Sequence, residues 1–235
     1  MARTDLTQIE AQLAEEAKRV SEKLGAPAGR KITIDNTGNL IAPGGEILGT
    51  EVDVIVVDFA SANYYYTAAY DPNNPASPVC FAFGDVINEM APEEQSPEPQ
   101  NADCRTCPHN QFGSSGNGKA CKNTRELAVV LADELEDPDA TPEMYMVSVS
   151  PTSLKHFDGA AKQIYRLFNG TPIKAILKMK AQQTANYFAL TFTDPRPNPH
   201  LERVFPLREQ VEEIICRQPD LTNYRPTKGR VAPRR

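Results

Sequence analysis

Apolar residues recur at steps of three and four over residues 4–25, which is the spacing of one face of an α-helix. The run ends at Gly25 and Pro27, residues typical of a helix C-terminus. The apolar stripe is narrow and the other faces are charged. We therefore expect an amphipathic N-terminal helix within residues 1–27 that either docks on the rest of the protein or pairs with a second copy of the chain.

From residue 31 the pattern changes to an alternation of apolar and polar positions, which is typical of β-strands. Strands are predicted at residues 31–35, 40–41, 52–59, 64–66, 79–83, 144–150, 172–180 and 187–193. Residues 124–135 fit either a strand or a short helix. Helices are predicted at residues 153–168, capped by Ser150 or Thr152 and closed by Asn169-Gly170, and at 207–217.

Many short strands with one helix between the later ones favour a mainly β, α+β fold. The arrangement predicts a small, partly open antiparallel barrel with peripheral helices. A core over residues 28–217 would then carry an insertion at about 80–124. Within it, residues 88–103 combine three prolines with Glu, Gln and Ser, and predict a mobile acidic loop. Residues 218–235 are expected to form a disordered basic tail.

Composition and charge narrow the classes of function. The net charge of -6 excludes a histone-like protein that coats nucleic acid by bulk positive charge, but it allows a local basic groove. No signal peptide is visible, and the longest apolar stretch is too short to span a bilayer. We therefore expect a cytoplasmic protein that makes no contact with a membrane.

Four of the five cysteines lie in the insertion, namely Cys80, Cys104, Cys107 and Cys121. Cys104 and Cys107 are spaced C-x2-C, so that one tight turn can present two thiolates to a tetrahedral ion. A glycine-rich stretch then leads to Cys121. Thiols stay reduced in a cytoplasm, which favours metal ligands over disulfides. We predict a structural zinc ion held by these four sulfurs, with no open coordination position.

Two alternatives stay open for this cluster: His109 is the fourth ligand in place of Cys80, or the thiols bind no metal. A catalytic zinc is disfavoured by the surroundings of the histidines. His200 has Glu202 at the H-x-E spacing of zinc nucleobase deaminases, but it lies in a proline-rich stretch with no metal partner, and no zincin motif occurs. We therefore expect that the metal holds the fold together and that the protein is not an enzyme.

Basic residues alternate with aromatic rings in and near the insertion, a combination suited to single-stranded nucleic acid because cations bind phosphates and rings stack on bases. The candidate contacts are Tyr64, Tyr65, Tyr66, Arg105, Phe112, Lys119, Lys122, Arg125, Lys174, Lys178 and Lys180. Other roles stay open. Lys119 and Lys122 would neutralise a negative zinc–thiolate cluster, the tyrosines would pack in the core, and the lysines at 174–180 would form an ordinary solvated face.

Residues 104–123 resemble the C-x2-C-P-x-N-x-[FW]-G-S…G-K-x-C-[KR]-N knuckle of zinc-containing single-stranded DNA-binding proteins of tailed bacteriophages. Residues 150–155 and 188–192 are similar to later parts of the same proteins. The resemblance covers roughly residues 31–217. It implies an OB-fold with a zinc-bearing insertion, no enzymatic activity, and binding of single strands during phage replication or recombination in the host cytoplasm, with replication or recombination proteins as further partners.

The chain departs from this family at its end. Such proteins often finish with an acidic tail that recruits partners, whereas this chain has no acidic residue after Asp220 and finishes with Arg234 and Arg235. The tail would instead contact DNA phosphates or act as a solubilising end. A second function class also stays open: a phage factor that binds the host transcription or replication machinery through the knuckle and the acidic loop.

Overall fold

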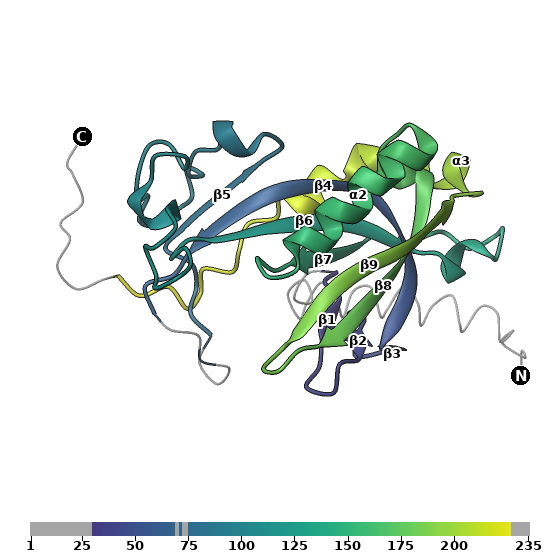
Figure 1. Ribbon diagram of the computed structural model, residues 1–235, viewed down its shortest axis with the longest axis horizontal. Helices are drawn as coiled ribbons and strands as arrows, with labels where there is room; N and C mark the ends of the chain where they lie inside the picture. The colour runs from purple at the N-terminus through teal and green to yellow at the C-terminus, as the bar shows by residue number, and fades with distance from the viewer. Residues whose placement is uncertain (1–29, 69–70, 72–74, 227–235) are drawn as a thin grey trace, which may run out of the picture.

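The computed structural model describes residues 30–68, 71 and 75–226 (Figure 1). The predicted N-terminal helix, and with it the proposed pairing of two copies, lies outside the described residues. So does the tail from residue 227 onward. Residues 218–226 are described, and there the Tyr224 hydroxyl donates a hydrogen bond of 2.9 Å to Oε1 of Glu98.

The fold is mainly β, with antiparallel sheets and few helices, as predicted. The main sheet has the strand order β7-β6-β4-β8-β9, with β5 also paired to β4. Its strands are β4 (Glu51–Tyr65), β5 (Cys80–Gly84), β6 (Lys122–Leu131), β7 (Tyr145–Val149), β8 (Ala175–Gln183) and β9 (Phe188–Pro197). Among the described strands no pairing joins β7 to β9, so no closed barrel is present in this part of the chain.

The long strand β4 organises the molecule, because it merges the two predicted strands at 52–59 and 64–66. One edge pairs with β6 along almost its whole length. The other edge pairs first with β8, over Glu51–Ile55, and then with β5, over Ser61–Tyr65. Figure 1 shows β4 and β6 running together out of the main body toward β5. The two strands thus carry the insertion away from the sheet on a shared ribbon.

Both faces of the sheet are covered, which explains why residues 54–57 are a continuous apolar run. Val54 and Val56 belong to a core under the helix α2 (Leu154–Phe168), together with Phe157. Ile55 and Val57 belong to a second core on the opposite face. Alternate residues of a strand point to opposite faces, so both sets are buried only when each face has a cover.

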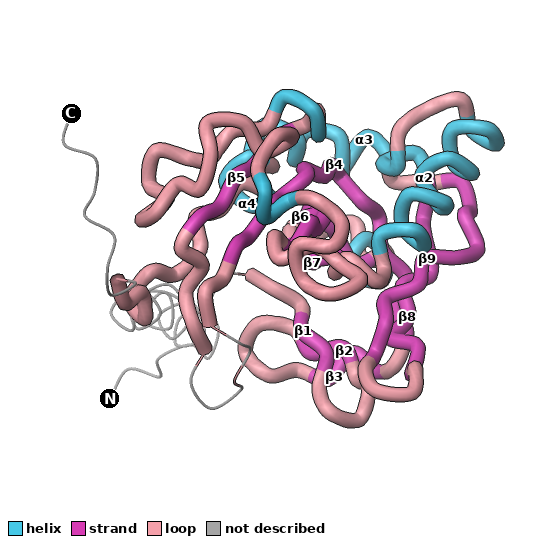
Figure 2. Tube along the Cα trace, turned by 60° about the vertical axis from the view of Figure 1, so that its left-hand side comes forward, coloured by secondary structure: helices cyan, strands magenta, loops and turns pink. Residues whose placement is uncertain are grey.

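The helix α2 follows the predicted bounds, and Figure 2 shows it along β9. Asn169 ends it in the left-handed conformation, at φ 47°. The predicted cap was wrong, because Ser153 is the N-cap residue and no side chain caps the helix. The buried Oγ of Ser153 instead accepts a hydrogen bond of 2.9 Å from the Leu190 N–H, which ties the start of α2 to β9.

The second core is covered by short turns where one helix was predicted at 207–217. These are α3 (Leu201–Val204), a 3₁₀ turn (Phe205–Gln210) and α4 (Glu212–Ile215). Pro206 lies in the first turn of the 3₁₀ segment, where its missing backbone donor costs little, but it prevents α3 from continuing as one helix into this segment. Residues 124–135, left open between helix and strand, form the end of β6 and a 3₁₀ turn (Asp133–Leu135).

A small second sheet precedes β4 and consists of β1 (Thr33–Ile34), β2 (Leu40–Ile41) and β3 (Ile47–Gly49). Two backbone bonds join its start to β7: Ile32 N–H donates to the Met146 carbonyl over 2.9 Å, and Met146 N–H donates to the Arg30 carbonyl over 2.6 Å. Ile32 and Leu40 are buried in the core under α2. The segment that carries β1 to β3 therefore packs against the main sheet beside β7.

The predicted mobile loop at 88–103 is instead bonded along β5. The N–H groups of Glu93 and Glu98 donate to the carbonyls of Phe81 and Val79, over 2.9 and 2.7 Å. The Ser96 hydroxyl donates to the Phe81 carbonyl over 2.9 Å and accepts from its N–H over 3.0 Å. An edge strand offers unpaired backbone groups, and this segment satisfies them. The polar composition of the segment did not reveal that pairing.

Candidate metal and nucleic-acid site

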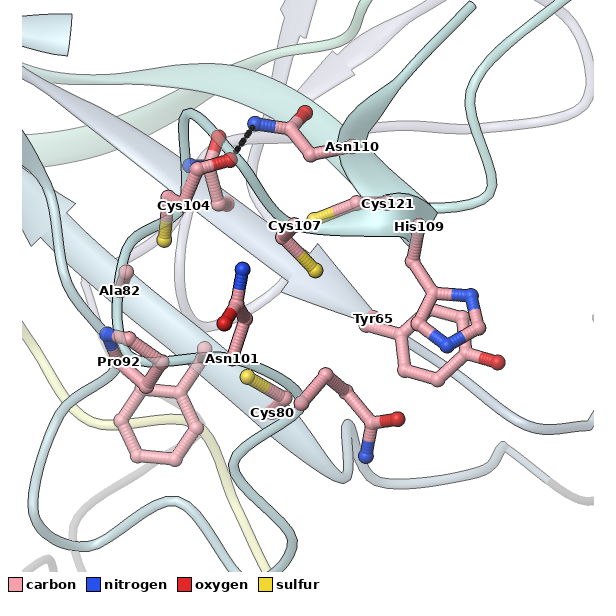
Figure 3. A pocket seen from close by; sticks show the side chains of 13 residues that line it. Tyr65, Cys80, Ala82, Pro92, Asn101, Cys104, Cys107, His109, Asn110 and Cys121 are labelled. Atoms are coloured by element: carbon pink, nitrogen blue, oxygen red, sulfur yellow. Dashed lines mark hydrogen bonds between the residues drawn. The ribbon is translucent and has the colours of Figure 1, made fainter. Parts of the chain in front are cut away.

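The four predicted cysteines come together at the outer end of the β4–β6 ribbon. Cys80 opens β5, Cys121 immediately precedes β6, and Cys104 and Cys107 lie on the turn between them. All four are buried and line one small cavity of about 20 Å³ (Figure 3). That volume holds roughly one water-sized sphere. The fold therefore gathers four sulfurs from three separate segments around a space for one small guest.

Backbone hydrogen bonds hold the knuckle (residues 104–121) in this shape. Cys104 N–H donates to the Met90 carbonyl over 3.0 Å, and Cys121 N–H donates to the His109 carbonyl over 2.8 Å. The Asn110 amide donates to the Cys104 carbonyl over 2.8 Å. Gly113 has a φ of 88°, a conformation that a side chain would strain. These hydrogen bonds fix the positions of Cys104 and Cys121 within the knuckle.

Burial raises the pKa of three thiols in this cavity, those of Cys80, Cys104 and Cys121. The pKa of Cys121 rises to about 12, first because burial disfavours a thiolate and then because the other cysteines lie close. The pKa values of Cys80 and Cys104 are raised for the same leading reason. A cation among the sulfurs would reverse this balance, since metal binding requires thiolates and releases protons.

Within residues 30–68, 71 and 75–226, no group of three or more His, Cys, Asp or Glu side chains is positioned as it stands to hold a metal ion. His109, the alternative ligand, lines the same cavity, and its ring stacks on Tyr65 with centroids 4.2 Å apart and an interplanar angle of 22°. Figure 3 shows the two rings lying against each other at the border of the cavity. The stacking contact gives His109 a packing role.

A groove of about 730 Å³ lies beside the knuckle, on the face of the ribbon formed by alternate residues of β4 and β6. Tyr64 and Tyr66 line it from β4 and its C-terminal extension, and Lys122 lies directly opposite Tyr64 on β6. Lys31 and Arg217 add two further cations from distant parts of the chain. The groove thus combines two aromatic rings with three basic side chains.

The two tyrosines differ in their surroundings. Tyr64 is half-buried and packs edge-on against Phe83, with centroids 6.0 Å apart. Burial, followed by the nearby Glu126 carboxylate, raises its pKa well above the ordinary value. Tyr66 is 37% exposed, and burial is also the main cause of its raised pKa. Both rings are neutral at physiological pH, and Tyr66 offers the more open face for a stacking partner.

No family model matches this sequence, and no curated protein or solved structure is similar to it. No helix in the described part of the chain is long and apolar enough to cross a membrane. The interpretation of the site therefore depends on its own geometry and chemistry.

Three predicted contacts lie on the knuckle itself. The ring of Phe112 is 82% exposed, and Lys119 Nζ lies 5.2 Å from its centroid in a cation–π contact. Lys119 also donates to Oδ1 of Asn110 over 3.3 Å. Arg105 is exposed and pairs with Asp103 at 3.4 Å. These three residues lie on the surface of the insertion and do not line the groove.

The other predicted basic contacts are engaged elsewhere. Arg125 is buried on β6 and pairs with Asp158 of α2 at 3.7 Å. Lys178 and Lys180 on β8 pair with Glu51 on β4, at 3.3 and 3.2 Å. Lys174 lies outside that strand, and its Nζ donates to the carbonyls of Phe168 and Asn169 over 3.3 Å at the end of α2. The predicted basic face of β8 is thus matched by carboxylates of the neighbouring strand.

Nine residues that line the groove were not predicted as contacts from the sequence, namely Lys31, Thr124, Glu126, Met146, Ser148, Arg217, Gln218, Pro219 and Asp220. Thr124 and Glu126 share a face with Lys122 through the period of two along β6. That alternation was the one available signal, because these positions are polar within an apolar strand. Lys31, Ser148 and Arg217 reach the groove only through tertiary pairing.

Proposed function

We propose that this protein binds single-stranded DNA in the groove on the β4–β6 ribbon beside the zinc knuckle, and that it has no catalytic activity. The observation that carries the proposal is the meeting of Tyr64 and Tyr66 with Lys31, Lys122 and Arg217 in one groove. Aromatic faces stack on bases of any sequence, and cations track the backbone phosphates. Such a site binds with little sequence preference.

An OB-type architecture is part of the proposal. The path β7-β6-β4-β8-β9 places the first strand of a five-stranded core, β4, between the second and the fourth, β6 and β8. The helix α2 lies between the third and fourth strands, β7 and β8. OB-folds bind oligonucleotides on their second and third strands and on the loop between the first two. The groove has residues from β6, β7 and the start of that loop, which supports this assignment.

In this proposal one zinc ion would be held by Cys80, Cys104, Cys107 and Cys121. The donor set and the size of the cavity support it, because four thiolates satisfy a structural zinc ion completely. The ion would supply a crosslink and no reactive chemistry. The cluster would join the start of β5 to the start of β6, the two strands that flank β4 at Tyr65. Tyr64 and Tyr66 are then held at the groove.

The biological setting follows the resemblance of the knuckle to phage proteins. We propose that the protein covers single strands during phage replication or recombination in the host cytoplasm, where replication or recombination proteins meet it. The basic end of the chain, which includes Arg225, Lys228 and Arg230, would add phosphate contacts in place of an acidic recruiting tail.

The direct test is fluorescence anisotropy of a labelled oligonucleotide titrated with the protein at several salt concentrations. We expect tighter binding to a single strand than to a duplex of equal length, and affinity that falls as salt rises. Three groove cations predict a slope of log K against log salt of about -2, since each neutralised phosphate on a single strand contributes about -0.7.

A flat salt response would contradict the electrostatic part of the proposal. Absence of binding at low salt, for protein shown to be folded, would contradict the proposal as a whole. Binding to host transcription or replication proteins in that case would favour the alternative class, a protein-interaction factor.

Substitution of Tyr66 by Ala tests the stacking step. We expect a loss of about 1–3 kcal/mol in binding free energy, the usual value of one base–aromatic stack, with the free energy of unfolding little changed because Tyr66 is partly exposed. Tyr66→Phe should retain most of the affinity. Tyr165→Ala, a change at a 65% exposed ring on α2, is the matched control and should leave affinity unchanged. Equal losses in Tyr66→Ala and Tyr165→Ala would contradict a role for the groove.

A further inference from the structure

Glu126 places a carboxylate on the wall of the groove, where it cannot serve as a phosphate contact. It lies on β6 and is only 2% exposed, yet it lines the groove together with its hydrogen-bond donors. Thr124 Oγ1 donates to its Oε1 over 2.8 Å, and Ser148 Oγ donates to its Oε2. Among the ion pairs of the described residues, none includes Glu126. Within the described residues, its carboxylate is therefore stabilised by hydrogen bonds from hydroxyl groups and by no ion pair.

The Glu126 carboxylate can still accept a further hydrogen bond. A carboxylate has about four lone-pair sites, and the Thr124 and Ser148 hydroxyls occupy one on each oxygen. The Tyr64 hydroxyl takes a third site, because burial and then the Glu126 carboxylate, through its charge and a hydrogen bond, raise the pKa of Tyr64 and keep it protonated. A guest that brings N–H donors to the groove wall can thus use the remaining site and replace the bond from Tyr64.

The charge of Glu126 also determines which part of a strand can approach it. A buried carboxylate repels phosphate, whereas Lys31, Lys122 and Arg217 attract it. A bound strand would therefore keep its phosphates at the three cations and turn its bases toward Tyr64, Tyr66 and Glu126. The base edge that reaches Glu126 has to donate hydrogen bonds.

From this geometry we infer that Glu126 gives the groove a base preference at one nucleotide position, favouring bases with an exocyclic amino group over thymine or uracil. Guanine fits best, because N1–H and the N2 amino group are adjacent donors that match the two carboxylate oxygens. Cytosine and adenine offer one amino group each. Thymine presents N3–H between two carbonyl oxygens, and both carbonyls repel the carboxylate. The inference rests on the proposed single-strand binding and adds specificity to it.

The test compares an all-thymine labelled oligonucleotide with otherwise identical ones that carry a single dG or dC at successive positions, measured by anisotropy at one salt concentration. At the position that meets Glu126, we expect the oligonucleotide with dG to bind at least about fivefold tighter than the one with dT. This factor is the lower end of the discrimination that one side chain–base contact provides. Equal affinity for every oligonucleotide overturns the base preference and leaves the proposed function standing. Absence of binding to all of them overturns both.

Glu126→Gln separates the carboxylate from other sources of preference. Its amide is uncharged and donates to the thymine carbonyls, so the dG preference should fall to about twofold or less and affinity for the all-thymine strand should rise. Glu134→Gln is the matched control, because Glu134 also accepts a hydroxyl hydrogen bond, of 2.7 Å from Tyr145, but lies outside the groove lining. A dG preference that survives in folded Glu126→Gln overturns the inference. If circular dichroism shows that this variant does not fold, the wild-type oligonucleotide series still decides.

Discussion

Replacing Cys107 by Ser should abolish zinc binding and unfold the insertion. Purified wild-type protein should contain about one zinc ion per chain, and the variant close to none, by atomic emission spectroscopy. The physical reason is that structural zinc supplies about 10–16 kcal/mol of apparent binding free energy in zinc-finger peptides, and this energy is coupled to folding. Without it, the buried thiols of Cys80, Cys104 and Cys121, whose pKa values are raised by burial, have no cation to hold them together.

Cys216→Ser is the control for this experiment. Cys216 is the fifth cysteine, half-buried at the end of α4 and outside the cavity, so its replacement should keep the zinc content unchanged. Single-strand affinity should fall in Cys107→Ser and stay constant in Cys216→Ser, because only the first change releases the end of β4 that carries Tyr64. Wild-type protein that is folded and free of zinc after purification with the metal supplied would refute the structural-zinc proposal.

Replacing Phe157 by Ala should lower the free energy of unfolding by about 3–5 kcal/mol, the usual cost of removing a buried phenylalanine. Phe157 is a fully buried residue of α2, and its ring makes edge contacts with Phe59 and Phe192 at centroid distances of 5.0 and 5.3 Å. Urea denaturation followed by circular dichroism measures the change.

Tyr165→Ala on the same helix is the comparison, and we expect a change within about 0.5 kcal/mol, because most of that side chain is in water. Similar losses in the two variants would mean that α2 does not cover the sheet with the face that carries Phe157. The pair therefore tests the layer arrangement on which the position of the groove depends.

Local patterns predicted most of the strands and the helix α2, because each depends on residues close in sequence. The apolar run at residues 52–59 indicated a strand, and the spacing of Leu154, Phe157 and Ile164 agreed with a helix that has one buried face. The helix predicted at 207–217 failed for the same local reason. Its apolar positions fit a helical face, but the segment packs on the second core as a 3₁₀ turn and the one-turn helix α4.

The nucleic-acid contacts could be predicted only in part, since charge alternation along one strand says nothing about the strand beside it. Lys178 and Lys180 had the expected spacing, but the antiparallel register brings Glu51 against both. Arg125 stands in a basic sequence neighbourhood, and the packing of α2 buries it against Asp158. Lys122 lies opposite Tyr64 only because β4 and β6 pair in that register.

By itself the sequence determined the mainly β class, the candidate metal ligands and the basic, aromatic character of the insertion, because spacing and composition are properties of neighbouring residues. Tertiary structure alone decided that Cys80 shares a cavity with the other three cysteines, that residues 91–98 pair along β5, and that Glu126 lies in a groove with Tyr64 and Arg217. These relations join residues far apart in the chain. Strand register and helix packing determine them, and no local pattern encodes which distant partner a strand will take.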